Sequence, residues 1–367
     1  MPTTTREVRL ATTPRGLPVP GDLAVVETPL PSPGPGQLLV RNRHFLVFAG
    51  LRTLLGGAAK DTPVPGLHPG DTLYGPALGE VVHAPDASPL RPGDLVTHPL
   101  GWREYALVPA AQCAPVDPAF PDPVAHLSSG ATAYGALTRL TGVHPNDTVL
   151  VTGAAGGVGS LAGQLARLLG AGRVIGTTGS AWKAERLVTE LGYDAVVTGD
   201  SWRGSGERGA GYDAGAAGDS RRGNSAERHG EFAARLREVA PDGVDVVVDT
   251  VGGAQLAGAL EVARRGARFA LVGALAGQLA EEGGGGSAPV EIDGFGIVLK
   301  GLSIRGYLGA DHPDVEAEWT ERFAAWLRSG EIRFPLTVTS GIDQAPQALR
   351  KLIEGRQFGT AVVELTR

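Results

Sequence analysis

The hydrophobic pattern changes character near residue 124. Before that point, short apolar runs are separated by turns rich in proline and glycine, such as PSPGPG at 31–36 and RPGD at 91–94. Apolar runs of this length between such turns are typical of short antiparallel strands, and helical periodicity is weak. The pattern therefore predicts a small, mostly antiparallel β domain, with strands at 38–40, 78–82, 95–97 and 105–108.

After residue 124, β-branched runs alternate with helical segments of about ten residues. The run at 148–152 leads into glycines, and the leucines that follow have helical spacing up to Gly170. Strands that alternate with helices form a parallel sheet covered on both faces, and right-handed crossovers make it doubly wound. The pattern predicts strands at 148–152, 173–178, 195–198, 244–249, 268–273 and 303–308, and helices at 160–169, 181–191, 231–239 and 254–264.

One segment interrupts this alternation. Residues 201–230 are rich in glycine, arginine and serine and contain almost nothing apolar. Such a segment buries too little surface to offset its ordering entropy, so we expect a flexible insertion. A nucleic-acid role for its arginines is the weaker interpretation, because nearby acids partly neutralise them. A glycine run at 283–286 predicts a second flexible loop.

Near the C-terminus, aromatic residues recur at helical spacing. Trp319, Phe323 and Trp326 lie on one side of a helix that should end at Gly330. An aromatic stripe of this kind either packs into a core or forms a substrate platform. We favour core packing.

Composition and charge restrict the class of protein. The chain has 367 residues, 42% hydrophobic and 20% charged, which is typical of a folded protein with room for two domains. Its net charge is −6, whereas a dedicated nucleic-acid-binding protein normally has a basic domain. The first residues lack the apolar core of a signal peptide, and no stretch reaches transmembrane length. We expect a cytoplasmic protein without nucleic-acid or membrane partners.

Candidate metal ligands are few. Cys113 is the single cysteine, which excludes an internal disulfide framework and a cysteine-based structural zinc site. The eight histidines show no metal-ligand spacing. The sequence also lacks the GxSxG motif of serine hydrolases and the GxxxxGK[ST] phosphate loop. We therefore expect no metal site.

The most informative motif is VLVTGAAGGVGS at 149–160, between a predicted strand and a predicted helix. Ala154, Gly156 and Gly159 occupy the three positions of the dinucleotide-binding fingerprint. The second position lets the backbone approach a pyrophosphate, the third lets the helix pack closely, and the amides of the helix start face the phosphates. A glycine-rich turn without a ligand is the alternative. The place of the motif in a complete βαβ unit favours the cofactor.

The choice of nucleotide depends on the end of the second strand. An NAD-binding protein has an acid there for the ribose 2′-hydroxyl. Here the strand ends in Thr177, Thr178 and Ser180, and Lys183 and Arg186 follow. Small hydroxyl groups followed by cations suit a 2′-phosphate, so the pattern favours NADPH over NADH. The alternative for Lys183 is a solvated helix residue.

Several segments in combination resemble a known family. They include LLVRNRHFLVFAGLRT (38–53), GPALGEVV (75–82), GATAYGAL (130–137), GVDVVVDTVGG (243–253) and GRQFGTAVVEL (355–365). The sequence is similar to the medium-chain dehydrogenase/reductase superfamily, in its zinc-free branch of leukotriene B4 dehydrogenases, prostaglandin reductases and alkenal double-bond reductases. The resemblance covers nearly the whole chain.

The resemblance implies an α/β fold with two domains. A GroES-like β-barrel domain would contain residues 1–124 and 311–367, and a Rossmann domain with a doubly wound parallel sheet would contain residues 125–310 and the insertion at 201–230. Family members commonly dimerise through the edge strands of their nucleotide sheets, which implies a homodimer formed by the 303–308 strand.

The resemblance also implies the chemistry. Zinc-dependent relatives use a cysteine and a GHE motif as ligands, and the corresponding stretch here is GPALGE at 75–80, so no zinc is expected. Without a Lewis acid, the expected reaction is hydride addition from NADPH to the activated C=C bond of an α,β-unsaturated carbonyl. We expect Gln278 or Tyr307 to orient the substrate carbonyl and water to supply the proton.

The cofactor contacts are carried over position by position. The turn would hold the pyrophosphate, Lys183 the 2′-phosphate, and the end of the fifth strand the nicotinamide. The implied set is Ala154, Gly156, Gly157, Val158, Gly159, Ser180, Lys183, Thr250, Val272, Gly273, Ala274, Leu275, Tyr307, Leu308, Gly309 and Gln357.

Some positions depart from the family. Gly50 and Gln278 replace two tyrosines, and residues 198–200 replace an Asn-Tyr-Lys triplet that helps to hold the 2′-phosphate. A cleft without these phenols would suit a larger or polycyclic substrate. Two alternatives follow: a biosynthetic reductive cyclase, in which hydride addition to a polyene triggers C–C ring closure, and an NADPH-binding protein without turnover.

Overall fold

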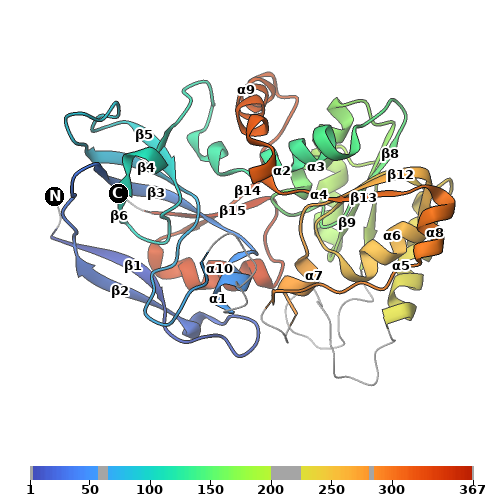
Figure 1. The fold of residues 1–367 in the computed structure, drawn as a ribbon, viewed down its shortest axis with the longest axis horizontal. Coiled ribbons are helices and arrows are strands. Elements are labelled where there is room, and N and C mark those ends of the chain that lie inside the picture. The colour runs from blue at the N-terminus through green and yellow to red at the C-terminus, as the bar shows by residue number, and fades with distance from the viewer. Residues whose placement is uncertain (1–2, 57–64, 200–224, 281–284, 366–367) are drawn as a thin grey trace. The chain divides into compact units, whose positions relative to one another are not determined.

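The chain forms two compact units, each built from segments that are far apart in the sequence (Figure 1). The structure, a computed structural model, describes residues 3–56, 65–199, 225–280 and 285–365. Unit 1 comprises Met1–Ser128, Leu336–Ile353 and Thr360–Arg367. Unit 2 comprises Ser129–Pro335 and Glu354–Gly359.

Unit 1 is rich in β-strands, and its described residues also form two α-helices. Its strands are β1 (Thr4–Leu10), β2 (Leu23–Pro29), β3 (Gln37–Val47), β4 (Ala77–His83), β5 (Leu95–His98), β6 (Tyr105–Pro109), β7 (Ala114–Pro115), β14 (Leu336–Ser340) and β15 (Thr360–Glu364). Its helices are α1 (Leu51–Leu55) and α10 (Ala345–Ile353).

The main sheet of unit 1 has the order β14-β15-β3-β4-β5-β7, with β6 also paired to β3, and β1 pairs with β2 separately. All pairs are antiparallel except β14 with β15. Alternate residues such as Leu38, Val40 and Val81 share one buried face. The predicted mostly antiparallel β domain is therefore confirmed.

Unit 2 alternates strands and helices. Its strands are β8 (Thr148–Val151), β9 (Arg173–Thr178), β10 (Ala195–Thr198), β11 (Val244–Asp249), β12 (Ala263–Leu271) and β13 (Ser303–Gly306). Its helices are α2 (Gly130–Gly135), continued by a π-helical turn (Ala136–Thr141), α3 (Gly159–Leu168), α4 (Ala181–Leu191), α5 (Ser225–Val239), α6 (Gly253–Val262), α7 (Leu275–Gln278), α8 (Gly294–Lys300) and α9 (Pro313–Ser329).

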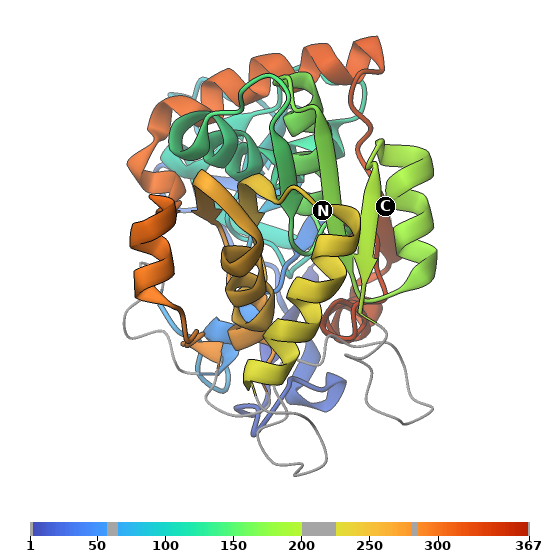
Figure 2. The ribbon, with the colours of Figure 1, turned by 90° about the vertical axis from the view of Figure 1, so that its right-hand side faces the viewer.

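The six strands of unit 2 are all parallel, in the order β10-β9-β8-β11-β12-β13. Phe269 of β12 packs with α5 and α6, whereas its neighbour Ala270 packs with the π-helical turn. Because successive strand residues point to opposite faces, the sheet is covered on both sides, and Figure 2 shows helices on each side of it. The predicted doubly wound parallel sheet is confirmed.

Some predicted bounds and segments differ from the structure. Residues 201–224 of the predicted insertion lie outside the described residues, as do residues 283–284 of the second predicted loop. Residues 225–230, predicted as flexible, instead begin α5. α5 extends toward its N-terminus beyond the buried residues Phe232, Ala233 and Leu236, because each residue added to an existing helix forms one further backbone hydrogen bond.

The predicted aromatic helix is α9, which ends at Gly330 in a left-handed conformation with φ 76°. Trp319 packs on α2 so closely that a Cβ at Gly130 would lie 1.9 Å from its ring. The favoured core-packing role is confirmed, since Trp319 and Phe323 are buried. The sequence predicts residues 311–367 in the first domain, but this packing makes α9 part of unit 2. Among the described residues, no helix is long and apolar enough to cross a membrane.

Candidate functional site

The glycine-rich turn at 153–159 joins β8 to α3 at the carboxyl edge of the parallel sheet. Gly153 N donates to Thr177 Oγ1 (3.0 Å), and Ala154 N donates to Thr177 O (2.9 Å), so the end of β9 anchors the turn. A Cβ at Gly159 would lie 2.5 Å from Gly153 O, so only glycine allows α3 to begin this close. At Gly156, the nearest atom to a Cβ would be 3.4 Å away. The outer side of the turn is therefore open to a ligand.

Lys183, in the first turn of α4, is buried with 6% of its surface exposed. Its Nζ donates to Gly355 O, and no carboxylate in the described part of the chain pairs with it. Burial lowers the pKa of Lys183 to about 8. The alternative of a solvated helix residue is wrong, because the side chain lies under the 354–359 segment. A buried cation held by a neutral carbonyl is suited to an anionic ligand.

Ser180 stands at the N-cap position of α4 but does not cap it. Its Oγ is buried and lacks a hydrogen-bond partner among the described residues. Buried hydroxyl groups nearly always have a partner, so this one is available to a ligand. Arg186 differs, since it pairs with Glu190 (2.6 Å) and stacks on the Phe358 ring (4.0 Å). Of the two predicted cations, Lys183 is the one left for a phosphate.

The segment Glu354–Gly359 crosses back from unit 1 and lies on the fingerprint turn. Gly359 N donates to Ala155 O (2.9 Å), and Gly359 forms an isolated bridge with Gly156. A Cβ at Gly359 would lie 2.1 Å from Pro335 O, and its φ is +76°, so glycine is required. In this segment, Gln357 is the one cofactor contact that the sequence predicts. The glycines of GRQFG were the signal that could have revealed the remaining contacts.

The loop after β11 carries Thr250 and lies beside the turn. Thr250 Oγ1 donates to Thr152 O (2.8 Å), so this predicted contact already holds the end of β8. Asp249, 1% exposed, accepts from Thr152 Oγ1 (2.5 Å) and from Gly252 N (2.9 Å). Burial raises the pKa of Asp249, and these hydrogen bonds lower it. The sequence analysis did not identify Asp249.

The segment after β12 is tied to the same loop. Val272 N donates to Asp249 O (2.8 Å), and Leu275 N to Thr250 O (3.1 Å). Gly273 fits because a Cβ there would lie 3.0 Å from Thr250 O. The predicted contacts at 250 and at 272–275 are thus joined by backbone hydrogen bonds.

The two candidate positioning groups differ in their surroundings. Gln278 ends α7 and is half-buried, and its side chain has no hydrogen-bond partner among the described residues. The Tyr307 ring stacks on His312 (5.2 Å) and lies so close to α2 that a Cβ at Gly135 would be 2.1 Å from its hydroxyl. Burial raises the pKa of Tyr307. Of the two, Gln278 is the side chain whose donor group is free to bind a substrate. Leu308 and Gly309, which follow Tyr307 in the chain, are exposed.

Possible metal ligands do not gather in the described part of the chain, where no three His, Cys, Asp or Glu side chains form a candidate cluster. Cys113 belongs to unit 1. Burial raises the pKa of its thiol to about 11, so the thiolate that binds metals is disfavoured at neutral pH.

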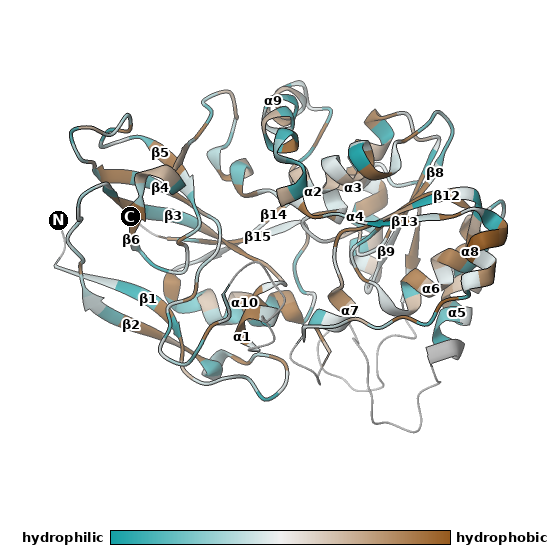
Figure 3. Cartoon of the chain, viewed as in Figure 1, coloured by the Kyte–Doolittle hydropathy of each residue, from teal (hydrophilic) through white to brown (hydrophobic). Residues whose placement is uncertain are grey.

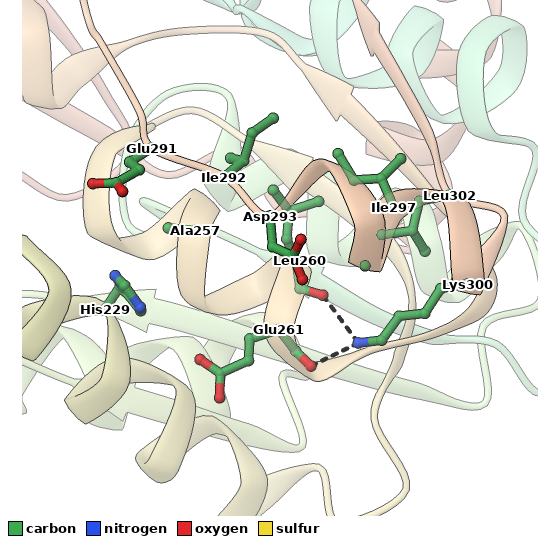
Figure 4. Close-up of a pocket in the computed structure, with 11 residues that line it drawn as sticks. His229, Ala257, Leu260, Glu261, Glu291, Ile292, Asp293, Ile297, Lys300 and Leu302 are labelled. Atoms are coloured by element: carbon green, nitrogen blue, oxygen red, sulfur yellow. Dashed lines mark hydrogen bonds between the residues drawn. The ribbon is translucent and has the colours of Figure 1, made fainter.

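A pocket of about 380 Å³ lies among α5, α6 and α8, apart from the predicted site residues (Figure 4). Lys300 donates from one wall to Leu260 O (3.2 Å) and Glu261 O (2.8 Å), which satisfies the last carbonyls of α6. Glu261 in turn pairs with Arg237 (2.6 Å). None of the predicted site residues lines this pocket.

Comparison with known proteins relates the chain to oxidoreductases over most of its length. Residues 6–116 match the family model described as the N-terminal domain of oxidoreductase, and residues 225–363 match that of zinc-binding dehydrogenase. The chain is 28% identical to the putative NADP-dependent oxidoreductase YfmJ of Bacillus subtilis, with 98% of each chain covered. It is 25% identical to the NADPH-dependent curcumin reductase of Escherichia coli, with 97% of this chain and 95% of the relative covered.

The chain belongs to the medium-chain dehydrogenase/reductase superfamily. The resemblance to its double-bond reductase branch is confirmed. The crystal structure of CurA from Vibrio vulnificus in complex with NADPH has the same fold, with a TM-score of 0.82 at 24% identity over 99% of both chains. In this superfamily member, the turn at 153–159, Ser180 and Lys183 fit a phosphorylated dinucleotide. The turn is open at Gly156, and within the described ranges the buried Ser180 hydroxyl has no hydrogen-bond partner and the buried Lys183 ammonium has no carboxylate partner.

Proposed function

We propose that the protein reduces the activated C=C bond of an α,β-unsaturated carbonyl compound with NADPH and without zinc. It is an oxidoreductase of the medium-chain superfamily, and its relatives are named as NADP- or NADPH-dependent enzymes. The observation that carries the choice of NADPH is Lys183, a buried cation whose Nζ donates to a carbonyl and has no carboxylate partner among the described residues. A 2′-phosphate would supply the missing negative charge.

Each part of the proposed site has a separate task. The amides of the turn at 153–159 would bind the pyrophosphate, as helix starts commonly do. Lys183 and Ser180 would bind the 2′-phosphate, and the segment at 272–275 would hold the carboxamide of the nicotinamide. When bound, NADPH supplies a hydride. The Gln278 amide would donate a hydrogen bond to the substrate carbonyl oxygen, where negative charge develops, and water would supply the proton.

The absence of zinc from the proposal rests on the sequence. The GHE ligands of zinc-dependent relatives are replaced by GPALGE at 75–80, and Cys113 has no second cysteine to accompany it. A hydrogen-bond donor is sufficient for conjugate addition, because the enolate that forms is far less basic than an alkoxide. Added zinc or a chelator should therefore leave the rate unchanged.

The function is tested by the loss of NADPH absorbance at 340 nm with a panel of 2-alkenals, cyclic enones and curcumin. We expect turnover of at least one compound, a product heavier by two hydrogens, and weaker activity with NADH. A Gly156→Val variant, which should bind the cofactor much more weakly than the wild type, is the control for background oxidation. NADPH binding without turnover of any compound would contradict the proposal.

A reductive cyclase is the second candidate. It is favoured by Gly50 and Gln278, which replace bulky phenols of related reductases and leave more space for a polyene. Product analysis separates the two candidates, since cyclisation forms a ring in addition to the gain of two hydrogens.

We also propose that the protein is a homodimer and that it acts in the cytoplasm. β13 is the last strand of its sheet. The preceding helix α8 exposes Phe295 (68%), Val298 (72%) and Leu299 (58%), and Figure 3 shows this helix as hydrophobic. An open edge beside an apolar helix favours a second copy. Val298→Glu should yield monomers in analytical ultracentrifugation, whereas Val188→Glu, at an exposed valine of α4, should not.

A further inference from the structure

One buried carboxylate joins the three segments that form the proposed cofactor site. The Asp249 carboxylate accepts from Thr152 Oγ1 (2.5 Å), directly before the fingerprint turn. It also accepts from Val251 N (3.2 Å) and Gly252 N (2.9 Å) in its own loop. The backbone oxygen of Asp249 accepts from Val272 N (2.8 Å). A single residue thus contacts the turn after β8, the loop after β11 and the segment after β12.

Thr152 completes the connection. Its hydroxyl hydrogen is given to Asp249, and its oxygen accepts from Thr250 N (2.9 Å). Thr250 Oγ1 returns a hydrogen bond to Thr152 O (2.8 Å). These groups are buried or half-buried, so water does not replace a lost partner at low cost. The relative positions of the turn and the loop therefore depend on the Thr152–Asp249 pair.

We propose that Asp249, acting through Thr152, is a positioning residue that sets the nicotinamide segment at 272–275 relative to the phosphate-binding turn. This inference rests on the proposed function. The adenosine half of the cofactor would contact the turn, Ser180 and Lys183, and the nicotinamide half would contact the 272–275 segment. Loss of the Thr152–Asp249 hydrogen bond should therefore weaken binding of the nicotinamide half, whereas binding of the adenosine half should not change.

The test uses two probes that read the two halves separately. Binding of 2′,5′-ADP, measured by calorimetry, reports on the turn and Lys183. Fluorescence of NADPH excited at 340 nm reports on immobilisation of the nicotinamide. In Asp249→Asn, the new amide places a donor against Gly252 N–H. Thr152→Val removes the hydroxyl and keeps the shape, and Thr152→Ser restores the hydroxyl.

We expect Asp249→Asn and Thr152→Val to bind 2′,5′-ADP within about twofold of the wild type. NADPH should bind about tenfold more weakly, equivalent to one lost buried hydrogen bond, with a reduced fluorescence change. Thr152→Ser should behave like the wild type. The matched control is Asp245→Asn at the other end of β11, where the carboxylate accepts from Thr148 N (2.8 Å) and Arg264 (2.7 Å). It should leave both probes unchanged.

Three results would overturn the inference. Equal weakening of both probes would show a general loss of structure, and an Asp249→Asn variant indistinguishable from Asp245→Asn would show that the carboxylate has no positioning role. Failure of both Asp249→Asn and Thr152→Val to fold would assign the pair to stability alone. If the wild type itself binds neither probe, the proposed function fails instead.

Discussion

Charged side chains at the two edges of the parallel sheet in unit 2 have different kinds of partner. At the amino edge, Asp147 pairs with Arg268 (2.5 Å), and Asp245 pairs with Arg264 (2.7 Å). At the carboxyl edge, Lys183 is held by a backbone carbonyl and Asp249 by a hydroxyl and backbone amides. Charges at the amino edge are neutralised within the fold. At the carboxyl edge, neutral dipoles hold each charge, so its field remains available to a ligand.

The difference supports the proposal that the carboxyl edge binds the cofactor. In an ion pair that is complete in the folded chain, the carboxylate already neutralises the cation, so the cation attracts a phosphate only weakly. A buried lysine without a carboxylate lowers the stability of the free protein and is stabilised when an anion arrives. Substitutions at the two edges should therefore separate binding from stability.

The largest effect is expected at Gly156. The side chain of a Gly156→Val variant would occupy the open side of the turn, where a Cβ meets no atom closer than 3.4 Å. The variant should keep its melting temperature but bind NADPH about 100-fold more weakly in calorimetry, because the pyrophosphate and the valine would compete for one space. Unchanged affinity would contradict the assignment of the turn.

Lys183→Met should have the next largest effect. NADPH should bind about 10 to 100-fold more weakly, since a charge-assisted hydrogen bond to phosphate is lost, and NADH affinity should stay the same. Thermal stability should be equal or higher, because a buried cation without a counter-charge has been removed. Equal losses for NADPH and NADH would place the 2′-phosphate elsewhere.

The pH dependence of NADPH binding should follow Lys183. Burial lowers its pKa to about 8 from the ordinary value of 10.5, so the free protein loses this proton as the pH rises above 8. NADPH affinity should fall by up to about tenfold per pH unit there, and Lys183→Met should abolish this dependence. Stability of the free protein should change in the opposite direction. Between pH 8 and 10.5 the unfolded chain binds more protons, so unfolding becomes harder as the pH rises.

The smallest effect on binding is expected at the amino edge. Arg268→Met removes the close ion pair to Asp147, whose side chain is 11% exposed. Urea denaturation should show a loss of about 1 to 3 kcal/mol in the free energy of unfolding. NADPH affinity should remain within twofold of the wild type. A large loss of affinity would show that the two edges are not independent.

Much of the fold could be predicted because local patterns agreed with one another. α4 has its predicted bounds, since its apolar residues have helical spacing and Gly192 adopts the left-handed conformation that ends it. β13 is shorter than predicted, and α8 was not predicted, because its apolar residues face outward and give no inward stripe. Patterns report reliably on elements whose apolar faces enter a core.

Within the candidate site, the sequence predicted the open turn but not what surrounds it. Lys183 was expected to hold a phosphate, yet its burial depends on the 354–359 segment, which is distant in the chain. Asp249 resembles any acid at a strand end until the structure brings Thr152 to it. The placement of the Tyr307 hydroxyl against α2 likewise depends on Gly135, a contact that no spacing rule reveals.

The sequence by itself determined the alternation of strands and helices, the glycine turn and the cations after the second strand, because each depends on neighbouring residues and on backbone geometry. The tertiary structure alone decided which charges are paired, which are buried and which distant segments share hydrogen bonds. Burial and pairing depend on the residues that other parts of the chain bring into contact. The electrostatic character of the site is therefore a property of the folded chain.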